Sequence, residues 1–97
     1  SDQIDLNKSA YIIGPGDTLD LVIFDLPEYY VKDGIKVIND GSASFPIIGS
    51  QYVSNLTLNQ ARIFLKEKYK QEVLNPELQL VFLKHHEALY LLLLQLL

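Results

Sequence analysis

The sequence predicts an α+β domain in which a small mixed β-sheet of about five short strands carries one helix on one face. Three observations lead to this fold class. Short β-prone runs separated by turn residues occupy residues 11–53. A single amphipathic pattern with helical spacing then runs from Leu58 to about Glu72. One more alternating apolar run, residues 77–83, returns the chain to the sheet.

A Gly-Pro-Gly turn stands near the start of this pattern. Gly14 and Gly16 permit positive φ, and Pro15 between them fixes its own φ at about −65°. Asp17 follows, at a position where its carboxylate can accept backbone N–H groups. We predict that these four residues form a structural turn between two apolar segments.

The first strand is expected at residues 19–24, which are rich in β-branched and aromatic side chains. Pro27 ends it because proline cannot donate a hydrogen bond to a ladder. Tyr29 and Tyr30 then lie in a loop. Since tyrosine suits wet interfaces, these two residues are candidates for a contact with a partner.

Asp40 and Gly41 give the strongest hairpin signal in the chain, because an Asp-Gly pair stands between the β-prone runs 35–38 and 43–48. We assign Asp40 and Gly41 to a structural turn. Pro46 lies within the second run and indicates an edge position or a bulge.

The helix has a clear start and end. Thr57 followed by Gln60 matches a capping box, and the helix should stop before Asn75 and Pro76. One face carries an apolar stripe that we expect to be buried: Leu58, Ala61, Leu65 and Tyr69.

Composition excludes several classes of function. The chain has 97 residues and no cysteine, which excludes disulfides, thiolate zinc sites and a cysteine nucleophile. The formal net charge of −4 opposes nucleic-acid binding, which requires a basic face, so we expect no nucleic-acid partner.

Charge is unevenly distributed. Residues 1–40 are mainly acidic and residues 62–70 mainly basic. Two interpretations stay open: two solvated faces, or a dipolar subunit whose acidic face meets a neighbour's basic face in a head-to-tail ring. In the second, Arg62 and Lys66 are candidates for a partner contact.

We divide the chain into three parts. Residues 1–10 are polar and are expected to form a flexible lead-in, and residues 11–84 form the domain. Residues 85–97 form a C-terminal segment that becomes almost wholly apolar but is too short to span a bilayer, which takes about 20 residues. We interpret it as the truncated start of a further domain or as an oligomer contact.

The search for chemistry gives little. The five aspartates between residues 17 and 40 invite a glycosidase interpretation, but turn chemistry explains Asp17, Asp33 and Asp40. His85 and His86 are adjacent and do not chelate by themselves, so we expect a surface or junction role. We assign no catalytic, cofactor-binding or metal-binding residue and expect no cofactor.

Four blocks in this order resemble the polysaccharide biosynthesis/export domain, whose family includes the outer-membrane polysaccharide export proteins of Gram-negative bacteria. The resemblance covers about residues 11–83. Asn55 stands where the family usually has glycine, at a position that asparagine tolerates in a left-handed conformation. The blocks are residues 11–19 with 26–28, residues 37–41 with 45–49, residues 53–57 with 60–61, and residues 75–77.

The resemblance implies a non-enzymatic subunit of a ring-shaped conduit in the periplasm and outer membrane. Capsular or extracellular polysaccharide would be the transported cargo, crossing the membrane with the help of an inner-membrane copolymerase. The ring would be a homo-oligomer of the full-length protein, and a β-grasp-like domain would begin within residues 85–97. The chain itself shows no basic and then apolar leader, so we expect no signal peptide within these residues.

Two rival functions stay open. Residues 16–19 also match the signature of LysM modules, which bind peptidoglycan or related glycans. A LysM module needs a helix soon after Leu19, whereas here a strand is expected. The other rival is a carbohydrate-active enzyme that uses the aspartates.

Overall fold

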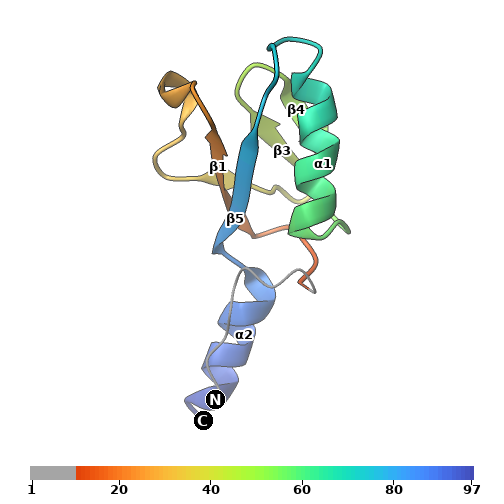
Figure 1. Ribbon diagram of the computed structural model, residues 1–97. Coiled ribbons are helices and arrows are strands. Elements are labelled where there is room, and N and C mark those ends of the chain that lie inside the picture. The colour runs from red at the N-terminus through yellow and green to blue at the C-terminus, as the bar shows by residue number, and fades with distance from the viewer. Residues whose placement is uncertain (1–10) are drawn as a thin grey trace.

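The computed structural model describes residues 11–97, except for the side chains of residues 87–91. Two small antiparallel sheets and one main helix form the domain, and a second helix projects from its end (Figure 1). The α+β class and the strands predicted from the sequence are confirmed. The strands are divided between two sheets instead of forming a single mixed one. The lead-in predicted for residues 1–10 lies outside the described residues.

The larger sheet is built around strand β1, Thr18–Ile23. Strand β2, Ile35–Lys36, pairs with one edge of β1 and strand β5, Leu78–Lys84, pairs with the other, both antiparallel. The inward-facing side chains of β1 and β5 are buried in the core, as the alternation of apolar residues predicts. They are Leu19, Leu21, Ile23, Leu78, Leu80 and Phe82.

The second sheet is a hairpin of β3, Ser42–Phe45, and β4, Gly49–Tyr52. Its turn contains Pro46, directly after β3, and Ile47, whose φ is 72°. Pro46 therefore ends the strand that the sequence predicted to continue through it.

The prediction that Asp40 and Gly41 turn a hairpin was wrong, because β2 pairs with β1 and β3 pairs with β4. The segment before β1 extends the pairing of β2: Gly16 N donates to Val37 O at 3.0 Å, and Val37 N donates to Asp17 O at 2.9 Å. The turn at Gly41 consequently carries the chain from one sheet to the other. A Cβ on Gly41, whose φ is +91°, would lie 2.5 Å from the Tyr52 ring, so this crossing requires glycine.

Helix α1, Leu58–Tyr69, packs against β5 and fills the core with the predicted stripe. The capping box is present: the Thr57 hydroxyl accepts from Gln60 N at 3.1 Å, and Gln60 Oε1 accepts from Thr57 N at 3.0 Å. The helix ends slightly earlier than predicted, and turn-like hydrogen bonds to Tyr69 O continue it to Val73. Asn55, with φ of 71°, adopts the left-handed conformation expected for it.

Tyr69 connects α1 to the second sheet. Its ring is fully buried, and its hydroxyl donates to Pro46 O at 2.7 Å. Burial raises the pKa of the Tyr69 hydroxyl above its ordinary value, so the group stays protonated and keeps donating.

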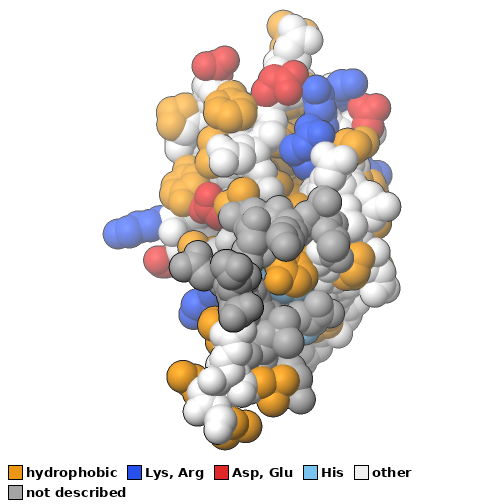
Figure 2. Space-filling model, turned by 60° about the horizontal axis from the view of Figure 1, so that its bottom comes forward, with side chains coloured by type: hydrophobic (Ala, Val, Ile, Leu, Met, Phe, Trp, Pro, Cys, Tyr) orange, Lys and Arg blue, Asp and Glu red, His pale blue; other side chains and the backbone are white. Residues whose placement is uncertain are grey.

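Helix α2, His86–Gln95, continues directly from β5 and points away from both sheets (Figure 1). Leucine favours a helix here. Its last turn and the residues after it expose a cluster of leucines, visible as the apolar tip in Figure 2: Leu92, Leu93, Leu94, Leu96 and Leu97. Among the described residues, neither α1 nor α2 combines the length and apolarity needed to cross a membrane. That residues 85–97 begin a further domain stays a prediction.

Replacing Thr57 by alanine removes the hydroxyl of the capping box and should lower the free energy of unfolding by about 1 kcal/mol. Urea unfolding followed by circular dichroism measures the change. Thr57→Ser keeps the hydroxyl and serves as the control. Equal stability of Thr57→Ala and the unsubstituted protein would contradict the role of the cap.

Replacing Tyr69 by phenylalanine keeps the buried ring but removes the hydrogen bond to Pro46 O. The expected loss is about 1 kcal/mol, because the carbonyl keeps a second donor, Ile48 N at 2.8 Å. Tyr52→Phe is the matched control, since the Tyr52 side chain is exposed. A loss as small as that of the control would show that the link does not stabilise the domain.

Candidate functional site

The Gly-Pro-Gly turn is closed by its own aspartate. Gly14 N donates to Asp17 Oδ2 at 2.9 Å, and Asp17 N donates to Gly14 O at 3.1 Å. Gly16 has a φ of +92°, a backbone conformation that residues with a Cβ rarely adopt. The Asp17 side chain is fully buried beneath the turn.

The segment before the turn is held against the entry to α1. Ile13 N donates to Leu56 O at 2.8 Å, and Asn55 N donates to Ile13 O at 2.9 Å. Ile12 forms an isolated bridge with Thr57. The apolar segment before the turn therefore pairs with the loop that caps α1, and the turn is fixed from both sides.

A β-bulge brings a histidine to this turn. Leu19 lies opposite Phe82, but Thr18 lies opposite Lys84, so Leu83 is an extra residue in β5. A bulge changes which face the following side chains point to. Leu83 and Lys84 are consequently both exposed, and His85 points inward.

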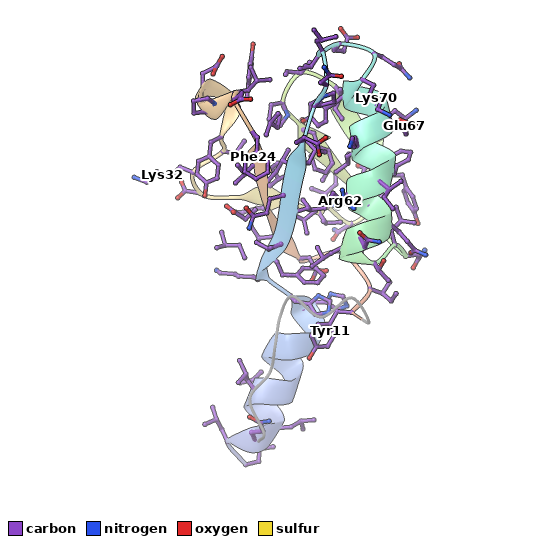
Figure 3. All side chains as sticks on the ribbon, in the orientation of Figure 1. Tyr11, Phe24, Lys32, Arg62, Glu67 and Lys70 are labelled. Atoms are coloured by element: carbon purple, nitrogen blue, oxygen red, sulfur yellow. The ribbon has the colours of Figure 1, made fainter. Side chains whose placement is uncertain are left out.

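His85 is fully buried and packs among aromatic rings. Its ring stacks on Phe82 with centroids 4.2 Å apart and lies 5.0 Å from the ring of Tyr11. Figure 3 shows Tyr11 beside the start of α2. The interpretation of His85 as a junction residue agrees with this position, but a surface position does not. Its burial could not be predicted because it depends on the bulge.

Asp17, His85 and His86 form a compact group, which we call the Asp-His cluster. His85 Nδ1 lies 3.0 Å from Asp17 Oδ2, and His86 Nδ1 lies 2.6 Å from Asp17 Oδ1. His86 N also donates to Asp17 Oδ1 at 2.6 Å. Because His86 is the first residue of α2, the carboxylate caps this helix and interacts favourably with its dipole.

Gly14 makes room for the cluster. A Cβ on Gly14 would lie 2.9 Å from His86 Cε1, closer than such atoms approach one another. The glycine thus allows the imidazole of His86 to lie against the backbone of the turn. The sequence predicted a structural turn at Gly14 and Asp17, but it did not predict that the two histidines would contact this turn.

The candidates for a partner contact lie on two separate areas. Tyr29 ends the short 3-10 helix η1, Pro27–Tyr29, and Tyr30 follows it; both rings are exposed. The Tyr30 hydroxyl donates to Asp20 Oδ1 at 2.5 Å, and this bond to a carboxylate raises the pKa of Tyr30. In Figure 3, Lys32 on this side and Arg62 on α1 lie on opposite sides of the domain.

The basic residues of α1 have local partners. Arg62 donates to Asn59 Oδ1 at 2.9 Å. Lys66 pairs with Glu77 at 3.1 Å, and Lys70 pairs with Glu67 at the same distance. Exposed pairs of this kind contribute little to stability, but they neutralise part of the basic face.

Asp40 lies in the turn that connects the two sheets. Its Oδ1 accepts from Ser42 N at 2.9 Å and from the Ser42 hydroxyl at 2.7 Å. These hydrogen bonds hold the pKa of the Asp40 carboxyl below its usual value. Asp40 and Gly41 thus shape a turn, though between different strands from those expected.

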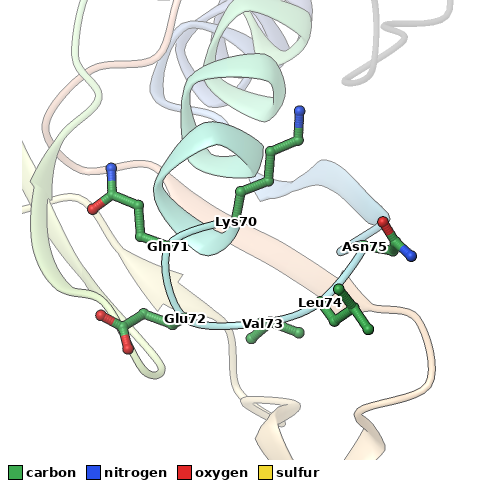
Figure 4. Close-up of a pocket in the computed structure, with 6 residues that line it drawn as sticks. All are labelled: Lys70, Gln71, Glu72, Val73, Leu74 and Asn75. Carbon is green, nitrogen blue, oxygen red and sulfur yellow. The ribbon is translucent and has the colours of Figure 1, made fainter.

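Two open pockets lie near the C-terminal end of α1, at the other end of the domain from α2 (Figure 1). The larger, about 470 Å³, is ringed by the loop of residues 70–75 (Figure 4). The smaller, about 230 Å³, lies between this loop and the β3–β4 turn. The smaller is lined mainly by polar surface and the larger about equally by polar and apolar surface, and neither adjoins the Asp-His cluster.

Comparison with known families decides the classification. The model of the family described as "Polysaccharide biosynthesis/export protein" matches residues 5–83. The chain belongs to this family. The resemblance found in the sequence is therefore confirmed, and the family is one of export proteins rather than enzymes. A search of the curated proteins gave no match.

The matched region of this export domain includes both sheets, α1 and the Gly-Pro-Gly turn, and it ends at Leu83. Asp17 lies inside the match, whereas His85 and His86 lie beyond it. The Asp-His cluster thus joins the family domain to the segment that follows.

Replacing Asp17 by asparagine should lower the free energy of unfolding by about 1–3 kcal/mol. The carboxylate accepts from both Gly14 N and His86 N, and an amide group would turn its own N–H₂ towards one of these buried donors. Thermal and urea unfolding measure the effect, with the exposed Asp33→Asn as control. Unchanged stability of Asp17→Asn would show that the closed turn does not need the charge.

Proposed function

We propose that this domain is a non-enzymatic structural subunit of a conduit that exports capsular or extracellular polysaccharide through the periplasm and outer membrane. The observation that carries the proposal is the family match over residues 5–83, which spans α1, the second sheet and all of the first sheet except Lys84. Family membership gives the role in polysaccharide export. The conduit, its location and its assembly are the proposed part.

Assembly into a homo-oligomeric ring requires two different surfaces on each subunit, because a head-to-tail contact joins unlike faces. The exposed Tyr29 and Tyr30 offer one such surface, since aromatic side chains are enriched at protein interfaces. The side of the domain that carries α1 offers the other. The positive charge on this side contributes less to a contact with a neighbour than the sequence suggested, because Lys66 and Lys70 each pair with a glutamate of the same subunit.

The remaining partners follow from the same role. The polysaccharide is cargo that passes along the ring, and an inner-membrane copolymerase delivers it. The net charge of −4 favours neither nucleic acid nor an anionic lipid surface as a partner.

The LysM alternative requires a helix soon after Leu19. Instead, Leu19 continues in β1 to Ile23, and the main helix α1 begins at Leu58. A glycan-binding module of that type is therefore disfavoured. The enzyme alternative loses its first candidate as well, because Asp17 is buried and engaged by the turn and both histidines.

Deletion of the gene in the organism that makes the protein tests the proposal. Secreted polysaccharide should fall and polymer should accumulate inside the cell envelope, and the unsubstituted gene should restore secretion. Unchanged secretion after deletion would overturn the export role. Turnover of a glycan panel by the purified full-length protein would overturn the non-enzymatic role.

The double variant Tyr29→Ser and Tyr30→Ser tests the ring surface in the same strain. It should restore secretion poorly, and native mass spectrometry of the full-length protein should show smaller assemblies, because two interface aromatics are lost. Tyr52→Ser, on β4 and at least as exposed, is the control. Normal assembly of the double variant would exclude this surface.

A further inference from the structure

We propose that the Asp-His cluster binds one divalent transition-metal ion, of which Zn²⁺ fits the donor set best. The ligands are Asp17, His85 and His86. The ion joins the Gly-Pro-Gly turn to the start of α2. This inference does not depend on the export role.

The first argument is the kind and number of donors. Two imidazoles and one carboxylate converge, and their candidate ligand atoms all lie within 4.8 Å of one another. Imidazole nitrogen suits zinc and its neighbours in the transition series, whereas Ca²⁺ and Mg²⁺ prefer oxygen ligands alone. Three protein ligands with a further position for water are typical of open zinc sites.

The second argument is distance. Zinc lies about 2.0–2.1 Å from nitrogen and oxygen ligands, so neighbouring ligand atoms around a tetrahedral ion are about 3.3 Å apart. His85 Nδ1 is 3.0 Å from Asp17 Oδ2, and His86 Nδ1 is 2.6 Å from Asp17 Oδ1. Both separations are somewhat shorter than this spacing, so the side chains need to move apart only slightly to admit an ion.

The third argument is that the carboxylate is already oriented. Gly14 N donates to Asp17 Oδ2 and His86 N donates to Asp17 Oδ1, which fixes the plane of the carboxylate between the two imidazoles. Such outer hydrogen bonds hold ligands in place at metal sites. The stacking of His85 on Phe82 fixes the second ligand in the same way.

The fourth argument is access. Asp17 and His85 are fully buried, but the side chain of His86 is 40% exposed. An ion can therefore approach from solvent along His86 and reach the two buried ligands. Because His86 begins α2, binding restricts the direction in which this helix leaves the domain.

The test uses the 97-residue chain without a histidine tag, treated with a chelator and then dialysed. Titration with Co²⁺ should produce visible absorption bands that saturate at one ion per chain and disappear when Zn²⁺ displaces it. Loss of an outer-shell partner alone commonly weakens metal binding 10- to 100-fold, so His86→Ala should weaken it by more than about tenfold. Asp33→Asn is the control and should bind as the unsubstituted protein does.

A measurement on the unsubstituted protein keeps the test independent of the variants' folding. Adding Zn²⁺ should shift the ¹⁵N resonances of the Nδ1 atoms of both His85 and His86, and a chelator should reverse the shift. Circular dichroism verifies that His86→Ala is folded. Absence of saturable binding, unmoved histidine resonances, or unchanged affinity in folded His86→Ala would each overturn the proposal and leave the cluster as a set of hydrogen bonds.

Discussion

The buried carboxylate of Asp17 is the interaction on which the arrangement of this domain depends. It accepts from the backbone of the turn at Gly14 and from the first residue of α2, and it contacts both imidazoles. A buried charge is costly unless several groups satisfy it. The turn, the bulge in β5 and the start of α2 must therefore be in place together, and each holds the others in position.

Local features of the sequence predicted local structure well. The Thr57 cap, the left-handed Asn55 and the apolar stripe of α1 each depend on residues a few positions apart, and the structure contains all three. The alternating run at residues 77–83 likewise predicted β5, in which Leu78, Leu80 and Phe82 are buried. Propensity and periodicity determine these features because the interacting groups are neighbours along the chain.

Pairings between distant residues could not be predicted in this way. The Asp-Gly signal at residues 40–41 is local, whereas the pairing of strands depends on distant residues. Residues 16–18 pair with β2 and the residue after it, and β3 pairs with β4 instead. The extra residue in β5 has no signature of its own in the apolar pattern. His85 was therefore expected only at the surface or at a junction, and its contact with Asp17, 68 positions earlier, was not predicted.

The central position of β1 has a consequence for how the domain forms during synthesis. The longer of its two strand partners is β5, which is synthesised about sixty residues later. The histidine partners of the Asp17 carboxylate follow β5 in the chain. To form contacts between residues so far apart in the sequence, the chain must lose loop-closure entropy before the contacts contribute favourable free energy. The larger sheet is therefore incomplete until the C-terminal strand arrives, whereas the β3–β4 hairpin contains all of its residues by Tyr52.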